Sequence, residues 1–269
     1  MLRPRIIPTL LVQNGGLVKT IGFKGGKYVG DPINAVKIFN EKEADELVVF
    51  DIDATVTGAE PDYRMIGNLA AECRMPLCYG GGVRTVDQAE RIISLGVEKV
   101  ALSSAAIERP ALLGEIAERI GRQSVVAVID VRRKFGLFRK GYEVVTHNAR
   151  KSHDVPPIGL ALMLERAGAG ELILNSVDRD GAMEGYDLEL AAAFRAELHV
   201  PLTVLGGAGS LDDIAELIAH CGTVGASAGS LFVFKGPRRA VLINYPDSGR
   251  KDEICRTGIQ RHLAVTERL

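Results

Sequence analysis

Eight short apolar runs alternate along the chain with stretches of helical period, and this alternation restricts the fold more than any other feature. Each run is rich in leucine or β-branched residues and has the length of one buried strand. The stretches between them carry apolar residues at helical spacing, with a Pro or Asp near the start of several. Eight β-α units in 269 residues predict a single closed α/β (β/α)8 TIM barrel rather than an open doubly wound sheet. The runs are residues 5–12, 46–53, 75–81, 98–104, 124–131, 171–177, 201–207 and 223–230.

The chain also repeats itself. Residues 80–107 resemble residues 206–232, and residues 43–54 resemble residues 168–182, both at an offset of about 125 residues. The repeat places equivalent glycine turns after the third and the seventh predicted strands, which is not expected of a doubly wound sheet. We therefore expect a barrel built from two half-barrel repeats.

Two regions depart from the alternation. Residues 132–149 alternate around Gly136 and Gly141, which predicts a β-hairpin inserted after the fifth strand. From Pro246 onward the chain is polar and charged, with a weak helical pattern at its end. We therefore divide the chain into a barrel, residues 1–235, and a C-terminal extension, residues 236–269, that is a short helix or partly disordered.

Charge and composition exclude several classes of partner. The 33 Lys and Arg nearly balance the 34 Asp and Glu, so no global charge attracts nucleic acid or an anionic membrane. No stretch approaches roughly 20 apolar residues, and we expect a cytoplasmic protein. The cysteines and histidines lack metal-ligand spacing, and no Walker or dinucleotide fingerprint occurs. We expect no metal and no cofactor, and we interpret the cysteines as buried apolar side chains.

Glycine turns after the seventh and eighth predicted strands indicate a phosphate site. Barrels of this kind bind phosphate there through backbone N–H groups, although such glycines can also serve only to make tight turns. The repeat supplies a second set of turns after the third and fourth strands. Two anion sites across one mouth suit an elongated ligand with a phosphate at each end. The candidate residues are Gly81, Gly82, Ser103, Ser104, Gly206, Gly207, Gly229 and Ser230.

Carboxylates at the C-terminal ends of the predicted strands are candidates for acid-base chemistry. Asp130 closes the apolar run VVAVI, a setting that can raise the pKa of a carboxyl group for proton transfer. A hydrogen-bonded structural role is the alternative for this residue. Asp51, Asp53, Asp178 and Asp180 follow the second and sixth strands, and one of the last two can simply make a turn.

Four charged residues stand at the opposite ends of the predicted strands. Arg5, Glu46, Lys99 and Glu171 each lie at or next to the start of an apolar run. Two cations match two anions, so a salt-bridged plug at the barrel floor is expected. Stability is the default interpretation of features on that face.

Ten short segments together form a highly specific pattern: RIIP (5–8), GDP (30–32), ADELV (44–48), GGGVR (80–84), EKV (98–100), AVIDVRR (127–133), GAGELIL (168–174), DRDG (178–181), GYDLEL (185–190) and GGAG (206–209). On these segments the chain resembles the HisF cyclase subunit of imidazole glycerol phosphate synthase over nearly all of residues 1–235. The resemblance implies that a HisH-type glutaminase docks at the N-terminal face of the barrel and that ammonia travels through the barrel. It also implies that the four floor charges form the ammonia gate, and that Asp130, Lys19 and Asp180 surround the reacting atom, with Lys19 in a loop after strand one.

The chain departs from that family at its active site. Leu11 stands where the family has one of two catalytic aspartates, and a leucine side chain cannot transfer a proton. Asp130 matches the second aspartate. Further departures are Ser103 for an Asn, Asn175 and Ala182 for Thr, and Leu205 for a Ser.

The ending GSLFVFKGPRRAVLINYP (229–246) is similar to a HisF-like branch associated with acetamidino modification of surface-polysaccharide sugars. That branch implies a separate amidotransferase beside the glutaminase, and a phosphorylated small molecule or nucleotide-sugar as ligand. Three hypotheses follow. The chain is an ammonia-using subunit in amidine formation, an authentic cyclase of histidine biosynthesis in which another carboxylate such as Asp51 or Asp53 assists Asp130, or a non-catalytic conduit that passes ammonia to a third protein.

Overall fold

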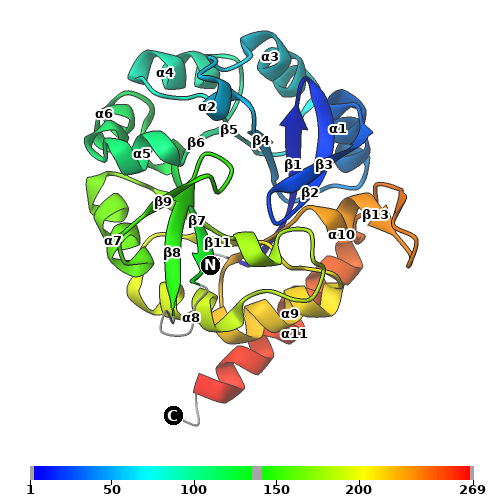
Figure 1. Ribbon diagram of the computed structural model, residues 1–269. Coiled ribbons are helices and arrows are strands. Elements are labelled where there is room, and N and C mark those ends of the chain that lie inside the picture. The colour runs from blue at the N-terminus through cyan, green and yellow to red at the C-terminus, as the bar shows by residue number, and fades with distance from the viewer. Residues whose placement is uncertain (1–2, 135–140, 267–269) are drawn as a thin grey trace.

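The computed structural model describes residues 3–134 and 141–266. Eight parallel strands close into a barrel around which helices form an outer ring, as the sequence predicts (Figure 1). In order around the barrel the strands are β1 (Arg5–Gln13), β4 (Leu47–Asp51), β5 (Leu77–Gly80), β6 (Lys99–Leu102), β7 (Val125–Arg133), β10 (Glu171–Ser176), β11 (Leu202–Leu205) and β12 (Gly225–Ala228), and β12 pairs with β1 to close the ring.

The long helices follow these strands one by one. They begin where the sequence offers a cap: the side chains of Asp31, Asp62, Thr85, Asp187 and Ser210 each accept a hydrogen bond from a backbone N–H of the first turn. The helices are α1 (Pro32–Glu41), α3 (Tyr63–Glu72), α4 (Val86–Ser94), α6 (Ala111–Ile120), α7 (Pro157–Ala167), α8 (Leu188–Glu197), α9 (Leu211–Cys221) and α11 (Ser248–Thr266). Short helices α2 (Ala54–Thr57), α5 (Ser104–Glu108) and α10 (Ser230–Val233) and 3-10 turns at Arg122–Ser124 and Val177–Arg179 lie in the loops.

Two apolar layers hold the barrel together. The larger lies between the strands and the helices, and residues such as Ile6, Leu47 and Phe39 are fully buried in it. The smaller fills the barrel interior with side chains that alternate with the outer set along each strand, among them Ile7, Val48 and Cys78. The period of two along each strand therefore separates the side chains of the barrel interior from those under the helices.

Two hairpins project from the mouth. β7 continues past the barrel and pairs antiparallel with β8 (Tyr142–Thr146), which pairs in turn with β9 (Lys151–His153). This confirms the hairpin predicted after the fifth strand, whose tip, including Gly136, lies outside the described residues. A second hairpin was not predicted: β1 pairs antiparallel with β2 (Gly16–Ile21), which pairs with β3 (Lys24–Gly30).

The chain after the barrel first makes a small ribbon of β13 (Phe234–Lys235) and β14 (Ala240–Val241). It then passes to α11, which packs along α9 on the outside of the barrel (Figure 1). The division of the chain into barrel and extension at residue 235 stays a prediction.

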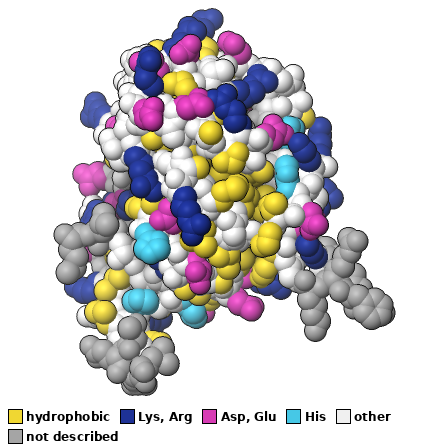
Figure 2. Space-filling view, turned by 90° about the vertical axis from the view of Figure 1, so that its left-hand side faces the viewer, with side chains coloured by type: hydrophobic (Ala, Val, Ile, Leu, Met, Phe, Trp, Pro, Cys, Tyr) yellow, Lys and Arg dark blue, Asp and Glu magenta, His cyan; other side chains and the backbone are white. Residues whose placement is uncertain are grey.

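The outer surface carries a mixture of charges. The side covered by α6 and α7 shows basic and acidic side chains spread around a band of hydrophobic ones (Figure 2). This agrees with the net charge of −1. None of the helices in the described part of the chain is long and apolar enough to cross a lipid bilayer.

Candidate active site

The mouth of the barrel holds a cavity of about 260 Å³. It is lined by the loops that follow the strands, together with the first hairpin. All eight predicted phosphate-site residues line it, and so do the three predicted catalytic residues Asp130, Lys19 and Asp180. The structure thus brings the candidates of the mouth together in one space, while their individual roles stay predictions.

The glycines of the two halves shape opposite walls of this cavity. Gly81 and Gly206 have φ values of 137° and 97°, which L side chains rarely adopt. A Cβ atom at Gly81 would lie 2.6 Å from the backbone oxygen of Asp51, and one at Gly206 would lie 2.7 Å from that of Ser176. Each turn therefore needs glycine for both its conformation and its space. The repeat seen in the sequence becomes two equivalent backbone cradles facing one cavity.

Asp130 lies near the end of the barrel part of β7, and its side chain lines the cavity. Its Oδ1 accepts a hydrogen bond of 2.9 Å from Nδ2 of Asn175 on the neighbouring strand β10. Burial raises the pKa of the Asp130 carboxyl to about 7, and the Asp180 carboxylate adds to the effect while the Asn175 hydrogen bond opposes it. A carboxyl group that is half ionised near neutral pH is suited to give and take protons.

The prediction that Lys19 lies in a loop is wrong. It lies in strand β2, because the first hairpin folds back over the mouth. Its side chain is buried, and its Nζ donates a hydrogen bond of 2.7 Å to the backbone oxygen of Thr9. Burial lowers the pKa of Lys19 to about 8, although the Asp180 carboxylate opposes the change. Gly229 makes room for this ammonium group, since a Cβ atom there would lie 2.5 Å from Nζ.

Asp180 is bound to the same hairpin. Its Oδ2 accepts hydrogen bonds from Oγ1 of Thr20, at 2.6 Å, and from the backbone N–H of Phe23, at 3.1 Å. Burial raises its pKa, and the two hydrogen bonds oppose that change. Asp180 therefore fixes the hairpin that carries Lys19, in addition to facing the cavity.

The remaining carboxylates of the mouth separate into two groups. Asp51 lines the cavity, and its Oδ1 accepts hydrogen bonds from the backbone N–H groups of Asp53 and Ala54. Asp53 accepts from Gln13 and from the backbone of Asn14, and Asp178 accepts from the backbone of Arg133. Asp53 and Asp178 therefore fix loop conformations and do not line the cavity.

Leu11, at the position where the resemblance predicts a catalytic aspartate, lines the cavity. It occupies the position in β1 that Asp130 occupies in β7: Leu11 pairs with Val18 of the first hairpin and Phe50 of β4, and Asp130 pairs with Val145 of the second hairpin and Asn175 of β10. One half of the mouth thus presents a carboxyl group at this position, and the other presents a branched alkyl chain.

A buried polar atom in the cavity wall, Oδ1 of Asn175, lacks a partner among the described residues, and the Asn175 side chain lines the cavity beside Asp130. A buried polar atom without a hydrogen bond costs free energy, so such atoms are commonly satisfied by water or a ligand. The cavity is therefore built to receive polar groups. No group of three or more metal-ligating side chains occurs within residues 3–134 and 141–266.

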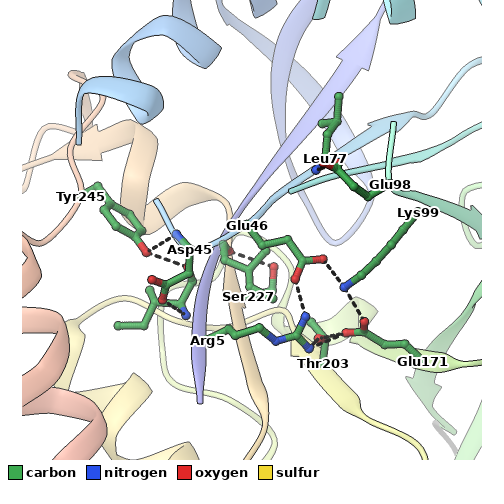
Figure 3. A network of polar contacts seen from close by, with 12 residues as sticks. Arg5, Asp45, Glu46, Leu77, Glu98, Lys99, Glu171, Thr203, Ser227 and Tyr245 are labelled. Atoms are coloured by element: carbon green, nitrogen blue, oxygen red, sulfur yellow. Dashed lines mark hydrogen bonds and ion pairs between the residues drawn. The ribbon is translucent and has the colours of Figure 1, made fainter. Parts of the chain in front are cut away.

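The four predicted floor charges form one closed ring (Figure 3). Arg5 binds Glu46, and it binds Glu171 at 2.7 Å. Lys99 binds Glu46 at 2.7 Å and Glu171 at 2.8 Å. Oγ1 of Thr203 donates a further hydrogen bond to Glu171, a member that the sequence did not single out because a threonine in a buried strand is unremarkable.

Pairing favours the charged forms of Arg5, Lys99 and Glu171. Burial alone would lower the pKa of Lys99 and of Arg5, but the carboxylates of Glu171 and Glu46 outweigh it, so both pKa values are raised. Burial alone would raise the pKa of Glu171, but Arg5 and Lys99 outweigh it and lower it. The ring closes the lower end of the barrel with matched charges.

Comparison with known proteins gives the family. A family model described as "Histidine biosynthesis protein" matches residues 5–237. A Vibrio vulnificus protein that carries, as a provisional assignment, the name imidazole glycerol phosphate synthase subunit hisF3 is 57% identical over 93% of this chain and 96% of its own. A Pseudomonas aeruginosa protein provisionally named as subunit hisF2 of the same synthase is 49% identical over 94% of this chain and 99% of its own. The Streptomyces avermitilis imidazole glycerol phosphate synthase subunit HisF is 42% identical over 86% of this chain and 90% of its own. With this agreement over the whole barrel, the chain belongs to the HisF family of imidazole glycerol phosphate synthase subunits.

Proposed function

We propose that this chain is the ammonia-using subunit of a glutamine-dependent amidine-forming system. A HisH-type glutaminase docks at the floor, ammonia passes the ring of Arg5, Glu46, Lys99 and Glu171, and the nitrogen reaches a ligand at the mouth. The product is an acetamidino group, in which nitrogen replaces the oxygen of an acetamido group and the oxygen leaves as water. The ligand is a phosphorylated small molecule or a nucleotide-sugar of surface-polysaccharide synthesis.

The single observation that carries this proposal is the contrast between a complete floor ring and an altered mouth. All four ring members are present and paired, while Leu11 replaces one of the two carboxylates that ring closure in the cyclase family uses. A chain that retains the entrance for ammonia and lacks half of the acid-base pair fits a reaction that needs ammonia but not cyclisation.

The barrel interior supports the route. The side chains between the two ends are apolar, and Ile7, Val48, Cys78, Val126 and Ile173 contribute to them. Neutral ammonia loses little on entering such surroundings, whereas an ammonium ion loses its hydration. The interior therefore favours transfer of the neutral molecule.

The mouth also offers an apolar wall. Leu11, Phe50 and Leu205 line the cavity, and Phe50 and Leu205 also belong to the inner apolar cluster. Such a wall suits the methyl group of an acetamido substituent, and Asp130 and Lys19 face the same cavity. We propose that Asp130 transfers the proton that accompanies loss of the amide oxygen, assisted by Lys19 and Asp180.

The second candidate is the cyclase of histidine biosynthesis. Asp130, whose burial raises its pKa to about 7, favours it, as does Asp51, a further carboxylate that lines the same cavity. In this mechanism Asp51 would supply the second carboxylate. The names of the relatives, which are those of imidazole glycerol phosphate synthase subunits, also favour this candidate.

The deciding experiment is turnover of the bisphosphorylated histidine-pathway intermediate by the purified chain with excess ammonium salt, which needs no partner. We expect no cyclisation by the natural chain, and an authentic HisF assayed beside it is the positive control. The Leu11→Asp variant tests whether one carboxylate accounts for the difference. Clear turnover by the natural chain would overturn the amidine proposal in favour of the cyclase.

A second experiment separates catalysis on this chain from a conduit role. The system is assembled with a HisH-type glutaminase and the amidotransferase, and Asp130→Asn is compared with Lys99→Phe. We expect Asp130→Asn to lower the rate by about 10²–10⁴-fold, the usual contribution of a general acid or base. Full activity of Asp130→Asn together with loss in Lys99→Phe would show that the chain only conducts ammonia.

A further inference from the structure

The segment that leaves the barrel returns to its floor. Tyr245, which lies before α11, is buried, and its ring packs against Phe232, with the ring centroids 5.2 Å apart, and edge-on against Phe39 of α1. Its Oη donates a hydrogen bond of 2.7 Å to the backbone oxygen of Ile6. Oη of Tyr245 also accepts a hydrogen bond of 3.3 Å from the backbone N–H of Asp45. A single side chain of the tail therefore bridges β1 and the segment that leads into β4.

Lys251, in the first turn of α11, reinforces this bridge. Its side chain is only 8% exposed, and Nζ binds Oδ1 of Asp45 at 2.9 Å and the backbone oxygen of Glu43 at 2.6 Å. Oδ2 of the same Asp45 accepts a hydrogen bond of 2.9 Å from the backbone N–H of Ile6. Asp45 is thus held by the tail on one side and by β1 on the other.

These contacts replace a missing part of the sheet. The ladder between β1 and β4 begins only at Thr9 and Val48. Nearer the floor, the backbone N–H of Ile6 is bonded to the Asp45 side chain instead of a β4 carbonyl. The relative position of β1 and β4 at this end therefore depends on Asp45 and on what holds it.

The bridged residues adjoin the ring. Ile6 directly follows Arg5, and Asp45 directly precedes Glu46, so the tail contacts at Ile6 and Asp45 each lie one residue from a ring member. The Arg5–Glu46 ion pair spans the same two segments that Tyr245 joins. A change in the spacing of these segments would change that ion pair.

We propose that Tyr245 and Lys251 are positioning residues for the floor ring: by fixing β1 against the start of β4, the C-terminal tail keeps the gate closed. This inference rests on the proposed gate function of the ring. It assigns to residues 245–251 a part in controlling entry of ammonia, and it accounts for a lysine that is buried at the start of an otherwise polar helix.

Cys78 provides a probe of the gate that needs no substrate. Its side chain is fully buried in the barrel interior, close to all four ring members, and it does not line the mouth cavity. Burial raises the pKa of the Cys78 thiol well above its usual value, so its reaction in the intact chain is slow. The rate at which methyl methanethiosulfonate modifies Cys78 in the purified full chain, followed by peptide mass spectrometry, measures opening of the floor.

We expect Lys99→Ala, which removes a ring member, to raise this rate about tenfold or more. Tyr245→Phe keeps the packed ring and removes only the bridging hydroxyl, and we expect about a fivefold increase, the effect of one lost hydrogen bond on an opening equilibrium. Lys251→Met should also raise the rate, and Lys251→Arg, which keeps the charge, should restore protection. Arg250→Met is the matched control, since this exposed neighbour pairs with Glu253 and should leave the rate unchanged.

The double variant Lys99→Ala/Tyr245→Phe distinguishes positioning from a general loss of stability. If the tail acts through the ring, the double variant reacts no faster than Lys99→Ala alone. Two results would overturn the inference and leave the proposed function standing. One is a double variant in which the two increases in the Cys78 modification rate add. The other is a Tyr245→Phe variant that reacts at the rate of the natural chain while Lys99→Ala reacts fast. Continued protection of Cys78 in Lys99→Ala would instead overturn the gate itself.

Discussion

At the floor of the barrel, two buried carboxylates pair with two partly buried cations, whereas at the mouth burial shifts the pKa values of Asp130 and Lys19 towards neutral pH. Each carboxylate of the floor ring contacts both cations, and pairing lowers the pKa of Glu171 and raises that of Lys99. At the mouth the shifts are reversed: burial raises the pKa of Asp130 and lowers that of Lys19. The same barrel therefore favours the charged forms of paired groups at its floor and disfavours those of buried groups at its mouth.

The largest effect is expected from removing one carboxylate of the floor ring. Glu171→Leu leaves Arg5 and Lys99 with a single buried partner, and loss of one partner of a buried pair costs about 3–5 kcal/mol of unfolding free energy. Urea unfolding at pH 7 measures it. The charge-balanced double variant Lys99→Met/Glu171→Leu is the control and should lose less than the single variant. Because the pKa of Glu171 is lowered, its stabilisation is present above the ordinary glutamate pKa and is lost as the pH falls through the lowered value.

At the mouth, removing a charged group should raise the free energy of unfolding instead of lowering it. The folded-state pKa of Asp130, about 7, exceeds its unfolded value, so its contribution to stability is present below the unfolded pKa and is lost as the pH rises to about 7. The change in unfolding free energy caused by Asp130→Asn should therefore be more favourable at pH 8 than at pH 5, by about 2–3 kcal/mol. An equal effect at the two pH values would contradict the raised pKa.

Lys19 should show the complementary dependence on a higher pH range. Its folded-state pKa of about 8 lies below the unfolded value, so stability is present above the unfolded pKa and is lost as the pH falls towards about 8. The change in unfolding free energy caused by Lys19→Met should be more favourable at pH 7.5 than at pH 10, by about 2–3 kcal/mol. Comparison between the two pH values cancels the lost hydrogen bond to Thr9. If the variant shows the same difference from the natural chain at both pH values, the buried ammonium group is not the cause.

The smallest effect is expected from a charge pair that belongs to neither end. Lys37 and Glu72 lie on α1 and α3, 3.6 Å apart, with both side chains well exposed. Lys37→Met should change the unfolding free energy by about 0.5 kcal/mol or less, as exposed pairs do. A loss comparable to that of Glu171→Leu would mean that burial is not what distinguishes the ring.

The sequence predicted the barrel because the strands are short, apolar and regularly spaced, and because the repeat excluded an open sheet. It missed the first hairpin, since glycines at positions 15, 16, 22, 25, 26 and 30 obscure the alternation of LVKTI. For that reason Lys19 was expected in a loop. A signal for this strand is present in the sequence. The run LVKTI (17–21) is rich in β-branched residues and is followed by a glycine turn at Gly22.

The sequence predicted the candidate site, like the fold, only in part. Residues at strand ends can be placed from the strand pattern alone: the phosphate-site candidates and Asp130, Lys19 and Asp180 line one cavity, whereas Asp53 and Asp178 do not. Tyr245 and Lys251 could not be found in this way, because the low hydropathy of the tail conceals one buried lysine and one buried ring. Contacts that depend on where a chain returns in space have no local signature.

The correspondence between Leu11 and Asp130 has a consequence for the direction in which a ligand binds. Two equivalent halves with two equivalent glycine cradles form a mouth with an approximate twofold axis, which an elongated ligand with similar ends could enter either way round. A carboxyl group at both positions would treat the two directions alike. With an alkyl chain at one and a carboxyl group at the other, only one direction brings a given atom beside the Asp130 carboxyl. This difference between the two halves gives a bound ligand a head and a tail.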